Sequence, residues 1–155
     1  MSDFILARAL HVLSIVMWIG GVAFVTTVAM PAIRRSSMPA ERVAAFHRFE
    51  SRFVWQARFW VLLAGISGLW MIWRTDTWSR FEDGQYWWMH AMVCLWAVFA
   101  LMLFVIEPFV LHRKMATATD PARIFGRMEW MHRALLLLAA LTVVAAVMGS
   151  HGWSW

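Results

Sequence analysis

The chain alternates between long apolar stretches and short charged ones. Uncharged runs cover residues 9–33, 59–73, 84–106 and 134–155. A helix of about 20 residues crosses the ~30 Å hydrocarbon core of a bilayer, and arginines at the ends of a shorter run can keep their charged heads at the membrane surface. The pattern predicts an all-α integral membrane four-helix bundle that forms a single membrane domain over residues 1–155. Its transmembrane helices are expected near residues 4–30, 54–74, 85–111 and 121–149.

Local sequence marks where these helices begin and end. Pro31 is expected to stop or kink the first helix, Asp83-Gly84 favours a turn before the third, and Asp120-Pro121 suits the start of the fourth. Between the first two helices, apolar residues recur at helical spacing, which favours an amphipathic helix over 40–53 on the inner leaflet. A simple extension of the second helix through 40–53 explains the same pattern.

Composition and charge agree with a membrane location. Of the 155 residues, 62% are hydrophobic and 15% are charged, which is too little polar surface for a soluble domain of this size. The net charge of +5 does not indicate nucleic acid, because the basic residues lie beside the apolar runs, where the lipid bilayer is the expected partner. They concentrate in the first and third connections, at Arg34, Arg35, Arg42, Arg48, Arg52, Arg113, Lys114, Arg123, Arg127 and Arg133.

This uneven distribution predicts an orientation. Cytoplasmic connections of membrane proteins carry an excess of lysine and arginine. The first and third connections are therefore expected in the cytoplasm and both termini on the outer (periplasmic) side, as in a multi-pass protein of the bacterial inner (cytoplasmic) membrane. Cys94 is the single cysteine, which excludes a disulfide framework, a zinc cluster of cysteines and a CxxCH haem attachment. Phosphate loops, nucleophile elbows and paired-carboxylate hydrolase motifs are not recognisable in the sequence.

Two histidines, His11 and His90, are expected in the outer half of the predicted bundle, and an ionisable side chain at membrane depth usually faces protein or a cofactor. His11 is expected about two turns below the outer surface and His90 about one turn below it. Two neutral imidazoles that face each other across a bundle can hold a haem iron from both sides. Ser14 and Trp18 share the stripe of His11, and arginines near the surface can meet haem propionates. The predicted haem b site consists of His11, His90, Arg8, Ser14, Trp18 and Arg74.

Other interpretations of the same residues stay open. Imidazole and soft sulfur suit Cu(I), so His11, His90, Cys94 and Met92 form an alternative copper set. A histidine in a membrane helix can also serve packing alone, which would make the chain a cofactor-free structural or assembly subunit of a membrane complex. Glu107 and Glu129 are expected to pair with Arg52, Arg58 or Arg133, and a proton-relay role for Glu107 is the alternative.

Three segments carry a family resemblance. ALHVLSIVMWIGG, MPA and FHRFESRFVWQARFWVLLAGISGLW resemble the CopD-like integral membrane proteins and, more distantly, HemJ-type protoporphyrinogen oxidases. The resemblance covers most of the chain. It implies a membrane bundle of four or more helices with a histidine in the first helix, here His11. The HemJ-type branch implies bound haem b and porphyrinogen oxidation, and the CopD-like branch implies copper handling.

One departure from the HemJ-type pattern affects the expected activity. Those enzymes carry a lysine near the start of the third helix, whereas Ala91, Met92 and Val93 follow His90 here and the only lysine is Lys114. Porphyrinogen oxidase activity is therefore not expected, while haem binding still is. The sequence predicts a cytochrome b-like protein in electron transfer or haem-dependent redox chemistry and leaves open whether it is an enzyme. Expected partners are a quinone or a periplasmic redox protein, and a homodimer or larger membrane complex.

Overall fold

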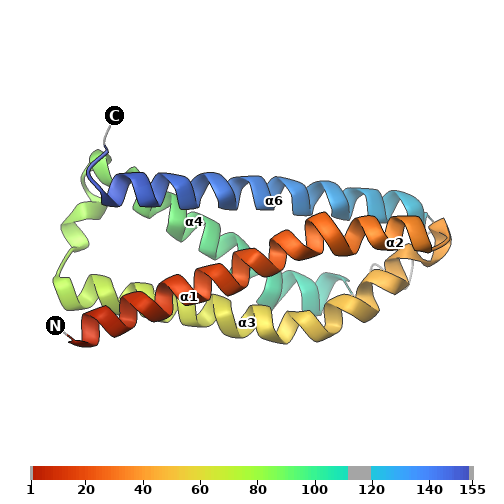
Figure 1. Ribbon diagram of the computed structural model, residues 1–155, viewed down its shortest axis with the longest axis horizontal. Coiled ribbons are helices and arrows are strands. Elements are labelled where there is room, and N and C mark those ends of the chain that lie inside the picture. Colours follow the sequence, from red (N-terminus) through yellow and green to blue (C-terminus); the bar gives the residue numbers. More distant parts are fainter. Residues whose placement is uncertain (1, 112–119, 154–155) are drawn as a thin grey trace.

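The computed structural model describes residues 2–111 and 120–153, and within these ranges the chain is almost entirely helical and has no strand. Figure 1 shows long rods that lie side by side, with both termini at one end. We call this the terminal end and the opposite one the distal end. The first rod consists of α1 (Ser2–Phe24), the π-helix η1 (Val25–Ala29) and α2 (Met30–Ser36), without a break between them.

Pro31 widens the first helix and does not end it. Proline lacks an N–H and its ring crowds the carbonyl one turn earlier, and the π-turn η1 lies directly before it. The hydroxyls of Thr26 and Thr27 donate to the carbonyl oxygens of Val22 and Ala23, each at 2.7 Å, which satisfies backbone acceptors near this wider turn. The helix therefore extends to Ser36, beyond the limit expected near residue 30.

The second rod is α3 (Arg42–Thr75), which follows the short 3₁₀ turn η2 (Pro39–Glu41). It runs continuously, so residues 42–53 extend the second helix, which is the simpler of the two interpretations of this stretch. Asp76 ends α3 in a left-handed conformation with φ 50°, and its N–H points at the carbonyls of the last turn.

A compact turn leads to the third rod. It contains η3 (Trp78–Phe81) and η4 (Gly84–Tyr86), where the Asp83 carboxylate accepts from the Gln85 N–H at 2.9 Å. The third rod is α4 (Trp87–Leu101) followed by a π-helix, η5 (Met102–Leu111). The last rod is α6 (Pro121–Ser150), and its N-cap is Asp120, whose carboxylate accepts from the Arg123 N–H at 3.1 Å. This start is the one predicted from Asp120-Pro121.

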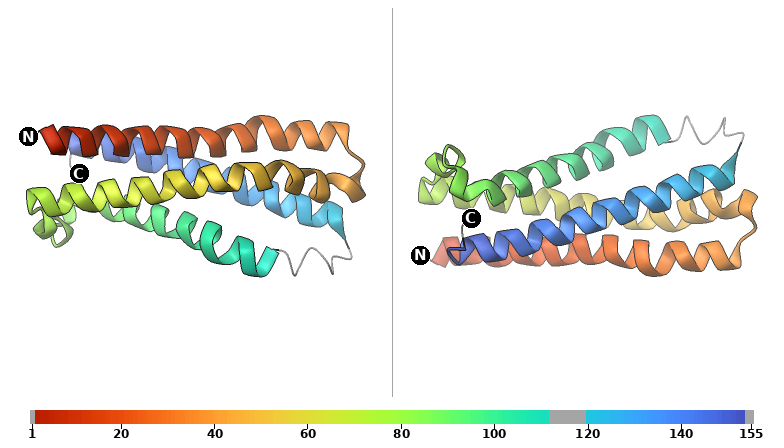
Figure 2. Two further views of the ribbon diagram at one scale, coloured as in Figure 1. Left: turned by 90° about the horizontal axis from the view of Figure 1, so that it is seen from below. Right: turned by 90° about the horizontal axis from the view of Figure 1, so that it is seen from above.

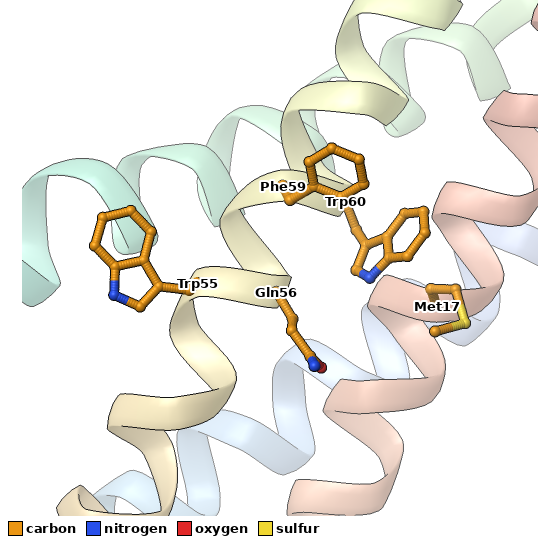
Figure 3. Close-up of a pocket in the computed structure, with 5 residues that line it drawn as sticks. All are labelled: Met17, Trp55, Gln56, Phe59 and Trp60. Carbon is orange, nitrogen blue, oxygen red and sulfur yellow. The ribbon is translucent and has the colours of Figure 1, made fainter.

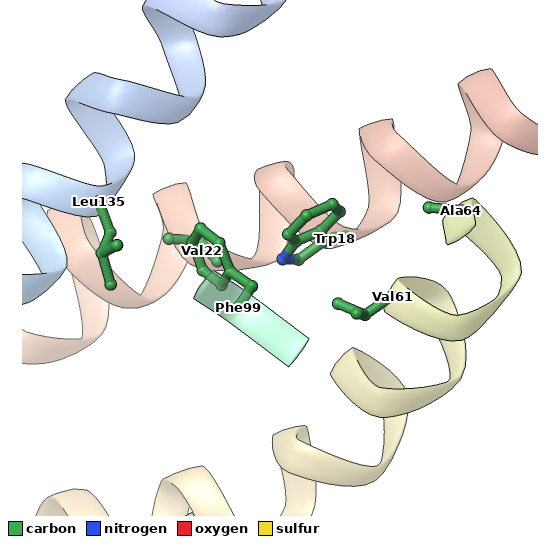
Figure 4. Close-up of a cluster of buried hydrophobic side chains, with 6 residues drawn as sticks. All are labelled: Trp18, Val22, Val61, Ala64, Phe99 and Leu135. Carbon is green, nitrogen blue, oxygen red and sulfur yellow. The ribbon is translucent and has the colours of Figure 1, made fainter. Parts of the chain in front are cut away.

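Two clusters of buried side chains hold the rods together. The first joins α1, α3, α4 and α6 near the middle of the molecule, and Figure 4 shows how its side chains converge. Its members are Trp18, Val22, Val61, Ala64, Phe99 and Leu135. The second lies toward the distal end and consists of Val25, Met30, Val43, Phe46, Phe125 and Met128. Figure 2 shows that η5 diverges from the other rods on approach to the distal end.

Gly65 of α3 determines which side of α4 faces α3. A Cβ on Gly65 would lie 2.7 Å from the indole of Trp96, closer than real Cβ contacts. The indole Nε1 of Trp96 donates to the Val61 carbonyl at 2.8 Å, so the ring is anchored in this place. Small residues of this kind let membrane helices approach closely.

Within residues 2–111 and 120–153, three helical segments are long and apolar enough to cross a membrane, namely Ser2–Ser36, Gly84–Glu107 and Pro121–Ser150. α3 is not among them, because its uncharged stretch is short and Arg58 and Arg74 bound it. The flanks of these rods that face away from the core expose large apolar side chains. Examples with exposed fractions above one half are Ile5 at 63%, Val16 at 60%, Ile66 at 65% and Leu137 at 61%. Soluble monomers rarely expose apolar surface on this scale.

Candidate functional site

His11 lies in the interface between α1 and α3. Its ring nitrogen Nδ1 is 2.9 Å from the Ala64 carbonyl oxygen and 3.2 Å from the Ser67 hydroxyl. A carbonyl oxygen only accepts hydrogen bonds, so we infer that Nδ1 carries the proton and donates it to Ala64. The opposite nitrogen, Nε2, then keeps its lone pair. This is the tautomer that binds a metal, and a backbone carbonyl is a common partner for the other nitrogen of a ligating histidine.

Gly68 of α3 leaves the space that the His11 ring occupies. A Cβ on Gly68 would lie 3.1 Å from Cε1 of His11 and 3.4 Å from Nδ1. Even alanine at this position would therefore press on the imidazole. Ser67, next to it on α3, is buried, and its hydroxyl donates to the Leu63 carbonyl at 2.5 Å. The ring is thus held by backbone and small side chains of one turn of α3.

Ser14 and Trp18 continue the buried flank of α1 below His11. Ser14 is fully buried and its hydroxyl donates to the Leu10 carbonyl at 2.6 Å. Trp18 is 4% exposed and its ring meets Phe99 edge-on, with ring centroids 4.9 Å apart. The indole N–H of Trp18 has no hydrogen-bond acceptor among the residues that the structure describes. A buried donor without an acceptor is uncommon in proteins, so this atom could serve a bound group.

The two predicted arginines lie near the terminal end. Arg8 is exposed on α1. Arg74 donates from Nε to the Asp3 carboxylate at 2.9 Å, which ties the end of α3 to the start of α1. Both side chains of this pair are about half exposed, at 49% and 42%. Arg74 therefore already has a protein partner at the level where a propionate was expected.

The structure does not bring His90 to His11 within one chain. His90 is exposed, and its ring meets Phe81 of η3 edge-on at 5.2 Å between centroids. The stripe expected to face inward, His90, Cys94, Ala97 and Leu101, is the exposed flank of α4, whereas Met89 and Phe99 are buried. Met92 is half-buried. In residues 2–111 and 120–153, no three His, Cys, Asp or Glu side chains lie close enough together to hold a metal ion.

The distal half of the molecule carries ion pairs. Arg34 of α2 binds both carboxylate oxygens of Glu129 on α6, with Nε 3.1 Å from Oε1. Glu129 is buried, with 4% of its surface exposed. Arg58 of α3 donates to Glu107 at 2.6 Å. The pairing of Glu107 with Arg58 was one of the predicted combinations, while the partner of Glu129 is an arginine that sequence reasoning did not name.

Other histidines are engaged locally. Nδ1 of His132 lies 2.9 Å from the Met128 carbonyl on its own helix, and its ring meets Phe46 edge-on at 5.6 Å. His151, at the end of α6, likewise has Nδ1 2.8 Å from the Val147 carbonyl and is exposed. His112 lies outside the described residues. Arg113 and Lys114, two of the basic residues expected in the third connection, also lie outside the described residues.

An aromatic groove opens on the outside of the α1 and α3 pair. Its volume is about 360 Å³, and Figure 3 shows the residues that line it. They are Met17, Trp55, Gln56, Phe59 and Trp60. A smaller groove of about 220 Å³ lies between α4 and α6 beside Trp88 and Gly149. Both are largely apolar, as expected for surfaces that meet acyl chains.

Long apolar helices, exposed apolar flanks and a part-buried histidine held by a backbone carbonyl define a helical membrane protein with a candidate ligand-binding imidazole. No protein-family model, curated protein or solved structure matches the chain. The class therefore rests on the chain's own helices and side chains.

Proposed function

We propose that this protein is a haem b-binding membrane protein, cytochrome b-like, with His11 as an axial ligand and with a role in electron transfer or haem-dependent redox chemistry. The observation that carries the proposal is the hydrogen bond of 2.9 Å from His11 Nδ1 to the Ala64 carbonyl. It leaves Nε2 as the basic nitrogen, in a segment where an ionisable residue otherwise costs free energy.

The residues around His11 hold its imidazole in the way that a ligand to such a group requires. Gly68 leaves the imidazole room against α3, and Ser67 and Ala64 keep its plane fixed. The N–H of Trp18, which has no acceptor among the described residues, could donate to a bound group two turns along α1 from His11. When bound, haem b supplies one-electron transfer at its iron. The chain's own residues orient the ligating nitrogen and fix its tautomer.

His90 remains the proposed second ligand, but its position requires α4 to rotate before it can bind the same haem as His11. It lies on the opposite flank of α4 from the buried Phe99. To reach a haem held by His11, α4 would have to turn by roughly half a revolution about its axis. The structure's geometry therefore supports His11 as the first ligand. His90 as the second ligand is supported only by the membrane depth that the sequence predicts for it.

The membrane arrangement is part of the same proposal. We infer that α3 crosses the bilayer as the fourth member of a four-helix bundle, with Arg58 and Arg74 at the two surfaces. The concentration of basic residues in the first and third connections supports both termini on the periplasmic side of a bacterial inner membrane. The resemblance to CopD-like proteins supports a membrane bundle of four or more helices, and the missing third-helix lysine argues against porphyrinogen oxidase activity.

Absorption spectra of the detergent-extracted protein test the proposal. We expect a Soret band and reduced b-type α and β bands in the wild type, strong loss of bound haem in His11→Ala, and no loss in the control His151→Ala. Comparison of His90→Ala with His11→Ala shows whether His90 is the second ligand. Stoichiometric copper without a Soret band would replace haem by the copper alternative. Protein that holds neither, after expression with both supplied, would contradict any metal cofactor and favour a structural subunit.

A further inference from the structure

The aromatic groove on the outside of α1 and α3 combines ring faces with hydrogen-bond donors. Four of its lining residues project from α3, and Figure 3 shows Met17 of α1 facing them. The volume of about 360 Å³ is at the lower end of the ~300–1,000 Å³ that small-molecule sites span. This space suits a single ring with the start of a tail more than it suits a whole long-chain lipid.

Three of the lining side chains carry N–H groups, namely the indoles of Trp55 and Trp60 and the amide of Gln56. Within residues 2–111 and 120–153, none of these N–H groups donates to a protein acceptor. The lining residues are all uncharged. The groove therefore complements a neutral and largely apolar molecule that carries acceptor oxygens.

A cation beside the groove is already engaged within the protein. The guanidinium of Arg58 lies over the Trp55 ring, 5.2 Å from its centroid. Its Nη2 donates to Glu107 at 2.6 Å and its Nε to the Leu103 carbonyl at 3.1 Å. An anionic phospholipid headgroup would require a cation that the lining residues do not supply, so charge complementarity favours a neutral ligand.

Two ring planes meet in a corner of the groove. The centroids of Phe59 and Trp60 are 4.9 Å apart and their planes are inclined at 73°. A flat ligand ring can stack on one of them while it meets the edge of the other, and aromatic pairs prefer both arrangements. The thioether of Met17 adds a polarizable contact from α1. This corner suits a flat, conjugated ring more than it suits an acyl chain.

The groove lies close to His11 along both helices. Trp60 is one turn before Ala64, whose carbonyl oxygen is 2.9 Å from Nδ1 of His11. Met17 is six residues after His11, which is about 9 Å along the axis of α1. A molecule in the groove would therefore lie within about two helical turns of the proposed haem ligand.

We propose that the aromatic groove binds a lipid-soluble quinone. The quinone ring lies in the corner of Phe59 and Trp60, one of its carbonyl oxygens accepts from the Gln56 amide, and its isoprenoid tail leaves along the exposed apolar flanks of α1 and α3. A quinone is neutral and flat and carries two carbonyl acceptors on an apolar ring, which is the chemistry that the groove complements. The assignment rests on the proposed function, since it gives an electron-transferring haem a partner that is soluble in the membrane.

Quinone uptake by the purified protein in nanodiscs of phosphatidylcholine tests the assignment. Decylubiquinone is titrated in, and its uptake at equilibrium is compared with that of protein-free nanodiscs. We expect one saturable site per chain in the wild type. Gln56→Leu should bind about three- to tenfold more weakly, because one hydrogen bond is lost. Gln85→Leu, at the only other glutamine, is exposed on η4 and should keep wild-type binding.

Two results overturn the assignment: no saturable uptake above that of protein-free nanodiscs, or equal binding by the wild type and Gln56→Leu. Loss of uptake when phosphatidylglycerol is added to the nanodiscs also overturns it, because the groove would then be a phospholipid site. If Gln56→Leu does not fold, Phe59→Leu takes its place, with an expected weakening of at least twofold.

The Soret band of the same samples separates this assignment from the haem proposal. Bound haem without saturable quinone uptake would overturn the quinone site and leave the haem proposal intact. Saturable uptake that depends on Gln56, in protein without a Soret band, would support the quinone site and contradict the haem proposal.

Discussion

The terminal and distal halves of the molecule keep polar side chains in an apolar surrounding in different ways. Around His11 the groups are neutral, and each donates to a backbone carbonyl of a helix, as Ser14 does to Leu10 and Ser67 to Leu63. The distal half also contains charged groups that bind each other across helices, as Arg34 binds Glu129. The neutral groups of the terminal half leave one basic nitrogen free, whereas each distal ion pair occupies both partners.

This difference indicates that the terminal half is suited to ligand binding, whereas the ion pairs of the distal half hold helices together. Neutral imidazole and hydroxyl groups bonded to carbonyls cost little to bury and keep acceptor capacity for a ligand. Paired ions hold specific helices together but cost desolvation, so removal of one partner exposes that cost. The following predictions, in order of expected effect, test whether the two halves respond in these two ways.

Arg34→Ala should have the largest effect on stability. It would leave the buried carboxylate of Glu129 without its partner, and uncompensated buried charges cost about 3 kcal/mol or more. Unfolding in mixed detergent and denaturant micelles measures the change. Arg34→Ala combined with Glu129→Leu should recover most of the loss, because no buried charge remains. If the double variant is no more stable than Arg34→Ala, the ion pair is not the reason for the loss.

Gly68→Ala should have an intermediate effect, located in the terminal half. The new Cβ would lie 3.1 Å from the His11 ring, and such overpacking costs roughly 1–3 kcal/mol. Under the haem proposal it should also lower haem occupancy, measured from the Soret band per protein. Gly20→Ala is the matched control, since nothing lies within 4 Å of a Cβ there. Equal stability and equal haem occupancy of the two variants would mean that the imidazole does not depend on the space at Gly68.

Arg74→Ala should have the smallest effect. Its pair with Asp3 is about half exposed on both sides, and exposed ion pairs contribute ~0–1 kcal/mol. The loss should diminish further in high salt, unlike that of Arg34→Ala. A loss as large as that of Arg34→Ala would show that burial does not determine how much an ion pair contributes to stability.

Local chemistry explains the parts of the fold that the sequence predicts well. The long apolar runs specify helices, Asp120-Pro121 specifies the start of α6, and Asp83-Gly84 specifies a turn, because each signal depends only on neighbouring residues. The position of His11 on a flank shared with Ser14 and Trp18 follows from helical spacing in the same way.

The inward flank of α4 could not be read from spacing alone. The helix is apolar all round, so the stripes of His90 and of Phe99 are equally acceptable to a periodicity argument. Which one faces the core is decided by two long-range contacts, that of Trp96 with Gly65 and that of Trp88 with Gly149. The partner of Glu129 was missed for a related reason, because Arg34 lies 95 positions away in the chain.

The π-turn η1 sets the rotation of α2 about the axis of the first rod relative to α1. A π-turn accommodates one residue more than an α-helical turn, and here it separates the imidazole seated on α3 from the guanidinium that binds α6. In an unbroken α-helix, one additional residue would rotate everything beyond it by about 100°. The wider turn at 25–29 takes up such a residue locally, so Arg34 can face Glu129 while His11 keeps its place against α3.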